Sequence, residues 1–143
     1  MTPQRVSLIT LGVADLTRAR AFYAALGWTA GDETPGVSFF QLPGIALCLF
    51  PLDDLAKDQG REGAALGTGA ITLAQNFASP ADVDAAFAAA LAAGATALKT
   101  PEPVFWGGYS GYYADPDGHV WELAHNPFWH LAADGTLSLA APE

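Results

Sequence analysis

Cysteine and positive charge are both scarce in this sequence. Cys48 is the single cysteine, which excludes an internal disulfide and fits a reducing compartment. Six lysines and arginines stand against 15 aspartates and glutamates, giving a net charge of −9. This balance argues against a nucleic-acid partner, because phosphate binding needs clustered cations.

Long apolar runs are also missing. No segment reaches the roughly 20 apolar residues of a membrane-spanning helix. The first residues show no basic segment followed by an apolar stretch, so no secretory signal is visible. We therefore expect a cytoplasmic protein without a membrane partner. With 143 residues, of which 51% are hydrophobic, the chain can form one compact domain over 1–143.

Two segments have the apolar spacing of helices, each with a start signal and a stop signal. The first lies between Asp15, a suitable N-cap, and Gly27. The second begins at Ser79 with Pro80 in the first helical position, and it ends at Gly94. We predict a helix in each segment.

One apolar strand precedes each predicted helix, and three shorter strand-like segments follow it. The preceding strands are expected at 6–13 and 70–77. The later segments are expected at 28–34, 37–42 and 45–50, and then at 95–101, 108–114 and 119–125. The chain thus repeats a βαβββ unit, and the extra residues of the second unit fall at PEPVFWGGYS.

These patterns divide the chain into module one (about 5–51), a linker (52–68), module two (about 69–126) and a C-terminal tail (127–143). The linker is rich in aspartate and glycine, which is typical of irregular structure. The tail carries Phe128, Trp129 and Leu131 and is too apolar for a free end. We therefore expect a homodimer.

The most informative segment is 104–127, VFWGGYSGYYADPDGHVWELAHNP. Its Asp115-Pro116-Asp117-Gly118 sequence has the chemistry of a tight turn between two strands, which predicts a β-hairpin. Glu122 lies in the middle of the returning strand. Burying a carboxylate there costs free energy unless it binds a metal, takes up a proton or accepts a hydrogen bond. A half-exposed strand with Glu122 facing water is the alternative.

Two βαβββ modules closed by a DPDG-x-x-x-E hairpin resemble the vicinal oxygen chelate superfamily. This group contains glyoxalase I, bleomycin-resistance proteins and extradiol dioxygenases. The most specific parts are LGVADLTRARAFYAALGW and DPDGHVWELAHNP. The resemblance implies an α+β fold in which two βαβββ modules form paired half-barrel sheets around a ligand cavity. Function does not follow from it, because the same scaffold serves several chemistries.

Metal-dependent members of that family place one ligand on the first and last strands of each module. The matching positions here are Leu8, Cys48, Thr72 and Glu122, of which only Glu122 is a good oxygen ligand. A shift in register would add Gln75. We therefore expect no cofactor, and the alternative is a divalent ion (Zn, Ni, Fe or Mn) held by Glu122 and Gln75.

An aromatic cavity is the other feature that the sequence predicts. Candidate ligand contacts surround Glu122 or share the inward face of the first strands: Trp106, Tyr109, Tyr112, Tyr113, Thr10, Thr72 and Asn76. Aromatic rings around a carboxylate suit a flat or cationic organic molecule. The alternative is that the rings fill the core.

The leading interpretation is a small-molecule-binding protein of the glyoxalase/bleomycin-resistance type, with Glu122 as the polar anchor. One alternative is a metal-dependent lyase or isomerase related to glyoxalase I, or an extradiol dioxygenase-like enzyme. Another is a metal-free enzyme in which Glu122 is the catalytic general base.

Overall fold

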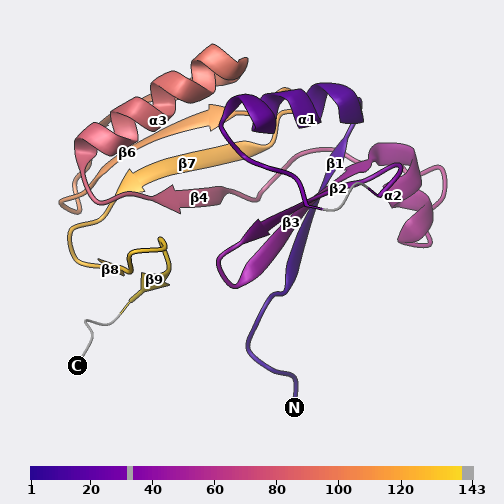
Figure 1. Ribbon diagram of the computed structural model, residues 1–143, viewed down its shortest axis with the longest axis horizontal. Helices are drawn as coiled ribbons and strands as arrows, with labels where there is room; N and C mark the ends of the chain where they lie inside the picture. The colour runs from indigo at the N-terminus through magenta and orange to yellow at the C-terminus, as the bar shows by residue number, and fades with distance from the viewer. Residues whose placement is uncertain (32–33, 140–143) are drawn as a thin grey trace. The chain divides into compact units, whose positions relative to one another are not determined.

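The computed structural model describes residues 1–31 and 34–139. The chain divides after Gly67 into two units, which we call unit one and unit two and describe separately (Figure 1). Both units combine a sheet with helices, so the α+β class is confirmed. No helix within the described ranges has the length and apolar character needed to cross a membrane.

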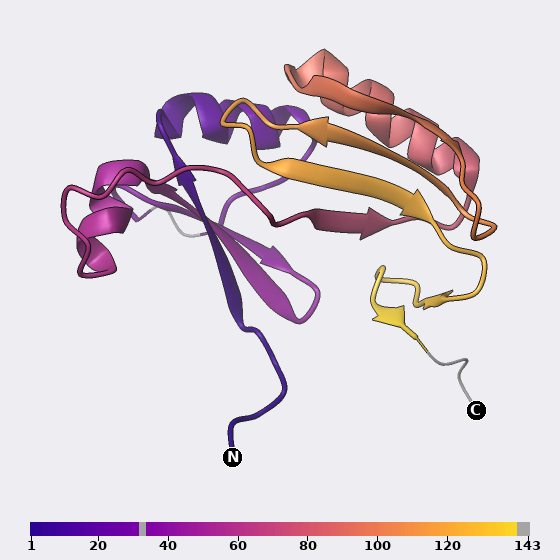
Figure 2. The same ribbon diagram turned by 180° about the vertical axis from the view of Figure 1, so that it is seen from behind.

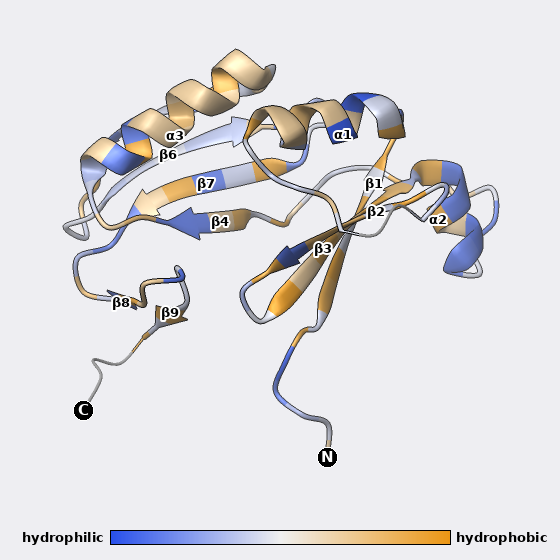
Figure 3. Ribbon diagram, in the orientation of Figure 1, coloured by the Kyte–Doolittle hydropathy of each residue, from blue (hydrophilic) through white to orange (hydrophobic). Residues whose placement is uncertain are grey.

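Unit one is a three-stranded sheet with two helices. Its elements are β1 (Leu8–Val13), α1 (Leu16–Ala25), β2 (Ser38–Leu42), β3 (Ile45–Pro51) and α2 (Leu52–Asp58). The strand order is β1-β3-β2, with β1 parallel and β2 antiparallel to the central β3. Figure 3 shows hydrophobic colour along most of β3, which is the buried centre of the sheet.

The first predicted helix is confirmed, with its predicted cap. The Asp15 carboxylate accepts a hydrogen bond from the Arg18 backbone N–H at 3.1 Å, and Gly27 follows the helix with φ of 92°. Phe22 and Tyr23 on α1 are buried against the sheet. Burying large side chains of this kind stabilises the fold by about 1.5–3 kcal/mol each.

Unit one departs from the expected pattern of elements in two places. The predicted linker begins with α2, because Leu52 and Leu55 pack over Gly12, where an added Cβ would lie 2.7 Å from the Leu52 side chain. The strand expected at 28–34 is absent from its described residues, and residues 32–33 lie outside the described ranges. The Gly31 N–H donates to the Phe39 carbonyl at 2.7 Å, which links that segment to β2.

Unit two is a four-stranded sheet with one helix and a small terminal hairpin. Its elements are β4 (Leu73–Asn76), α3 (Pro80–Ala93), β5 (Thr96–Pro103), β6 (Tyr109–Ala114), β7 (Val120–His125), β8 (His130–Leu131) and β9 (Leu137–Ser138). The strand order is β4-β7-β6-β5, and β8 pairs with β9 in a separate ribbon. In Figures 1 and 2, α3 lies on one side of the sheet and the β8–β9 hairpin lies on the other.

The second helix and the DPDG turn also form as the sequence predicts. Ser79 caps α3 by accepting from the Asp82 N–H at 3.2 Å, and Gly94 ends it with φ of 112°. In the turn, the Gly118 N–H donates to the Asp115 carbonyl at 2.9 Å. The Asp115 carboxylate accepts from the backbone N–H groups of Asp117 and His119, each at 2.9 Å, which holds β6 and β7 in register.

Strand register shows the same pairing of first and last strands in both units, although the strand expected at 28–34 does not form in its described residues. In each unit the first strand pairs in parallel with the last strand of the repeat, β1 with β3 and β4 with β7. Thr10 lies beside Cys48 in unit one, and Ala74 lies beside Glu122 in unit two. Cys48 and Glu122 are therefore equivalent positions, as the sequence comparison of the two halves predicts.

Candidate functional site

α3 covers one face of the unit two sheet, and we call the opposite face, which α3 leaves uncovered and on whose side the β8–β9 hairpin lies, the open face. α3 packs on β5, β6 and β7, and the side chains beneath it include Tyr113, Trp121 and Leu123, which are 1–4% exposed. Successive strand residues point to opposite faces. Tyr112 and Glu122, cross-strand partners in the β6–β7 register, therefore share the face opposite α3. In Figure 3 a hydrophilic band crosses the middle of β7.

Glu122 is half-buried on the open face and is held by Tyr112. The Tyr112 hydroxyl donates to one carboxylate oxygen, Oε2, at 2.9 Å. Burial, and then the hydrogen bond to Glu122 and its charge, raise the pKa of Tyr112, so the phenol stays protonated as a donor. Among the described residues, no lysine, arginine or histidine forms an ion pair with Glu122. The carboxylate thus faces the open side with acceptor capacity remaining.

The β5–β6 turn places an indole beside this carboxylate. The turn closes through a bond from the Val104 N–H to the Gly108 carbonyl at 3.0 Å. The Trp106 ring lies directly over Gly108, where an added Cβ would overlap the indole and lie 2.8 Å from the His125 carbonyl oxygen. Glycine at 108 is therefore required for the position of Trp106.

A second turn, after β7, contributes two more aromatic rings. The Asn126 side-chain oxygen accepts from the Phe128 N–H at 2.9 Å, and the Asn126 carbonyl accepts from the Trp129 N–H at 3.3 Å. The Phe128 ring lies against Gly107, where an added Cβ would be 3.3 Å away. The two turns therefore touch, and Asn126 holds Phe128 and Trp129 in place.

Between these groups lies a pocket of about 410 Å³, which we call the Glu122 pocket. Its lining consists of two amides, one carboxylate, one methyl group and three aromatic rings: Asn76, Asn126, Glu122, Ala124, Trp106, Phe128 and Trp129. The rings are only partly covered, with exposed fractions of 38% for Trp106, 42% for Trp129 and 72% for Phe128. A concave, mostly apolar site with few polar groups is typical of small-molecule binding.

Three of the predicted ligand contacts, Tyr109, Tyr112 and Tyr113, are not among the residues that line the Glu122 pocket. Tyr112 lies next to it through its hydrogen bond to Glu122, and the other two are elsewhere. Tyr113 lies under α3, stacked on Trp121 at 6.5 Å between ring centroids, because it follows Tyr112 on the strand and points to the other face. Tyr109 points to the α3 side for the same reason, and its hydroxyl donates to the Asp84 carboxylate at 2.6 Å. Neither ring lines the Glu122 pocket.

The three small polar residues predicted as ligand contacts on the first strands also lie in different places. Asn76, at the end of β4, lines the Glu122 pocket as expected. Thr72 is exposed and precedes β4. Thr10 lies in unit one, where its side chain forms a hydrogen bond with the Cys48 thiol. Of the three, only Asn76 belongs to this pocket.

The positions that hold a metal in metal-dependent relatives do not fit one in this chain. Leu8 has no donor atom, and Thr72 carries a weak one. Burial raises the pKa of the Cys48 thiol, which disfavours the thiolate that binds metals. The alternative partner, Gln75, pairs with Leu123 and lies on the sheet face opposite Glu122. Among the described residues, no three His, Cys, Asp or Glu side chains gather into a metal site.

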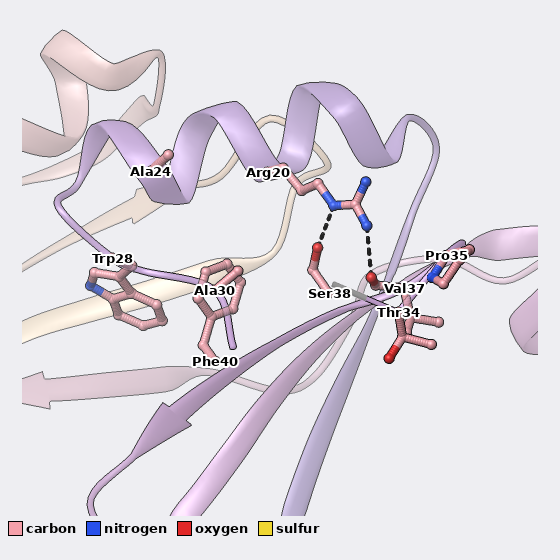
Figure 4. A pocket seen from close by; sticks show the side chains of 9 residues that line it. All are labelled: Arg20, Ala24, Trp28, Ala30, Thr34, Pro35, Val37, Ser38 and Phe40. Atoms are coloured by element: carbon pink, nitrogen blue, oxygen red, sulfur yellow. Dashed lines mark hydrogen bonds between the residues drawn. The ribbon is translucent and has the colours of Figure 1, made fainter. Parts of the chain in front are cut away.

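Unit one has a pocket of its own, of about 330 Å³, between α1 and the segment leading into β2 (Figure 4). The Arg20 guanidinium reaches across it, donating to the Ser38 hydroxyl and, at 2.7 Å, to the Val37 carbonyl. Trp28 and Phe40 form the other wall, with their ring centroids 5.7 Å apart. Arg20 therefore braces α1 against β2.

Sequence reasoning missed part of the Glu122 pocket. Asn126, Phe128 and Trp129 line the pocket, whereas the sequence pattern predicts the end of module two and the start of a tail at these residues. A local signal was available, because Asn-Pro followed by two aromatic residues is typical of a side-chain-capped turn. This local signal does not predict the contact between Phe128 and Gly107, because the two residues lie on segments that are distant in sequence.

Comparisons with known proteins identify the family and the fold. The family model described as Glyoxalase/Bleomycin resistance protein/Dioxygenase superfamily matches residues 5–123. An uncharacterised protein of Mycobacterium bovis is 52% identical over 42 residues, which are 29% of this chain and 28% of that protein. The matched part is thus little more than a quarter of that relative's length.

Solved structures show the same fold. A glyoxalase-related enzyme from Fulvimarina pelagi is 36% identical, with a TM-score of 0.91 over 97% of this chain and 100% of that one. A lactoylglutathione lyase from Agrobacterium tumefaciens is 24% identical, with a TM-score of 0.68 over 92% of this chain and 100% of that one. The second likeness concerns the fold alone.

Proposed function

The chain belongs to the glyoxalase/bleomycin resistance protein/dioxygenase superfamily, and within it we propose a small-molecule-binding protein whose ligand occupies the Glu122 pocket. The ligand class that we propose is a planar organic cation. The observation that carries the proposal is a carboxylate without an ion-pair partner among the described residues, set among three partly exposed aromatic rings.

Electrostatics and ring chemistry both support this ligand class. The ring faces of Trp106, Phe128 and Trp129 are electron-rich and attract cations as well as flat apolar surfaces. The net charge of −9 favours approach of a cation over approach of an anion. Asn76 adds an amide that can orient the ligand by hydrogen bonding.

The experiment is a calorimetric titration with three bicyclic probes of similar shape and different charge. N-methylquinolinium is the cation, quinoline at pH 8 is neutral, and 1-naphthoate is the anion. We expect N-methylquinolinium to bind at least tenfold more tightly than the other two, a preference of about 1.4 kcal/mol. Binding that is absent for all three probes, or unchanged when Trp106 becomes alanine, would contradict the use of this pocket.

Metal content gives a separate expectation. Because the donor set is poor, protein purified without added metal should hold well under one equivalent of Zn, Ni, Fe or Mn. Mass-spectrometric elemental analysis measures this directly, and Glu122→Gln serves as the matched protein. A stoichiometric ion that disappears in Glu122→Gln would instead favour the metal-dependent lyase or isomerase alternative.

A reaction in the same pocket is the second candidate. The relative from Fulvimarina pelagi, 36% identical, is described as a glyoxalase-related enzyme. In that case Glu122 is the group placed to accept a proton from a bound molecule, and the Tyr112 hydroxyl, at 2.9 Å from it, holds the carboxylate in position. Turnover of a bound compound that is lost in Glu122→Gln would support this candidate.

A further inference from the structure

A second pocket adjoins the Glu122 pocket within unit two. It has a volume of about 260 Å³, and we call it the His125 pocket. The β8–β9 hairpin forms one side of it, through His130, Leu131 and Leu137, and the end of β7 forms the other. His125, at the end of β7, is also a lining residue, and its Nδ1 lies 2.9 Å from the Phe77 carbonyl oxygen.

Three residues line both pockets: Asn76, Asn126 and Trp129. The side chain of Asn126 is engaged in its turn, where it accepts from the Phe128 N–H. Asn76 is small and lies at the end of β4. Trp129 has the largest of the three shared side chains, so it is the shared residue best able to separate the two pockets.

We propose that Trp129 is a specificity-determining residue that limits ligand length by separating the Glu122 pocket from the His125 pocket. This inference depends on the proposed function, because it concerns the ligand of the same site. A bicyclic ligand fits on the Glu122 side, and a substituent that extends past Trp129 meets the indole. Removing the indole should join the two pockets and admit the longer molecule.

The test compares N-methylquinolinium with N-hexylquinolinium on the wild-type protein and on Trp129→Ala. In the wild type the hexyl probe should bind no more tightly than the methyl probe, because the indole keeps the hexyl chain out of the His125 pocket. In Trp129→Ala the hexyl probe should gain at least tenfold relative to the methyl probe. The ratio of the two affinities is the readout, since losing the indole also removes contacts common to both probes.

Phe128→Ala is the matched control, because Phe128 is the neighbouring aromatic residue and lines only the Glu122 pocket. It should weaken both probes and leave their ratio unchanged. The double variant Trp129→Ala/Leu137→Trp should lose the gain, because Leu137 lines only the His125 pocket and the larger side chain refills it.

A crystal structure of Trp129→Ala completes the test without depending on any probe. One continuous space is expected where two pockets lie now. A wall that persists, or a tail that collapses into the gap, would overturn the role of Trp129. An unchanged affinity ratio would do the same. Failure of both probes to bind the wild type would instead count against the proposed function, and the variant structure would still decide the role of Trp129.

Discussion

Replacing Glu122 with glutamine should weaken binding of N-methylquinolinium by about tenfold to a hundredfold, on the order of 1–3 kcal/mol. The substitution keeps the shape of the side chain and an oxygen that can accept from the Tyr112 hydroxyl. It removes the negative charge that the bound cation would neutralise. Titration calorimetry at two salt concentrations measures the loss and its electrostatic share, because salt screens exposed charges more than buried ones.

The control for net charge is Glu102→Gln. Glu102 lies on β5 in an exposed pair with Lys99 at 3.3 Å, so the change removes the same formal charge away from the Glu122 pocket. Its effect on binding should be less than twofold. Thermal stability of Glu122→Gln should equal that of the wild type or exceed it slightly. A large drop in stability with unaltered binding would mean that Glu122 is a structural residue.

Tyr113→Ala should destabilise the protein by about 3–5 kcal/mol, which is typical of removing a large aromatic side chain from a core. Tyr113 is 2% exposed under α3 and stacks on Trp121. Burial, with a smaller effect from the charge of Asp115, raises the pKa of the Tyr113 phenol, as expected for a ring taken out of water. Urea unfolding followed by circular dichroism measures the change in the free energy of unfolding.

The matched variant is Tyr112→Ala, one residue earlier on the same strand. Because Tyr112 is only half-buried, its loss should cost clearly less than the loss of Tyr113, which is 2% exposed. It should also weaken probe binding, since Glu122 would lose its donor. Equal destabilisation by the two variants would refute the assignment of the tyrosines to opposite faces.

Much of the local structure was predictable because its causes are local. Asp15 and Ser79 cap helices through bonds to backbone groups three residues away, so the sequence alone contains both partners. The DPDG turn is equally self-contained, with Asp115 bonding Asp117 and His119. The placement of Glu122 in the middle of β7 followed directly from that turn.

Two other features could have been predicted from the sequence but were not. Tyr112 and Tyr113 are neighbours on one strand and cannot both point into one pocket. The spacing of Leu52, Leu55 and Ala56 is helical, yet the acidic composition favoured a linker.

Tertiary structure alone decided which face of the unit two sheet α3 covers and which residues meet on the other face. α3 covers the sheet face that carries Tyr113 and does not cover the face that carries Glu122. Strand alternation puts the two residues on opposite faces, but it does not determine which face the helix covers. The contact of Phe128 with Gly107 brings the turn after β7 against the β5–β6 turn. The alternating pattern, the caps and the turn were thus determined by sequence, because their bonds span only a few residues. The Glu122 pocket was not, because its walls come from segments that meet only when the sheet packs.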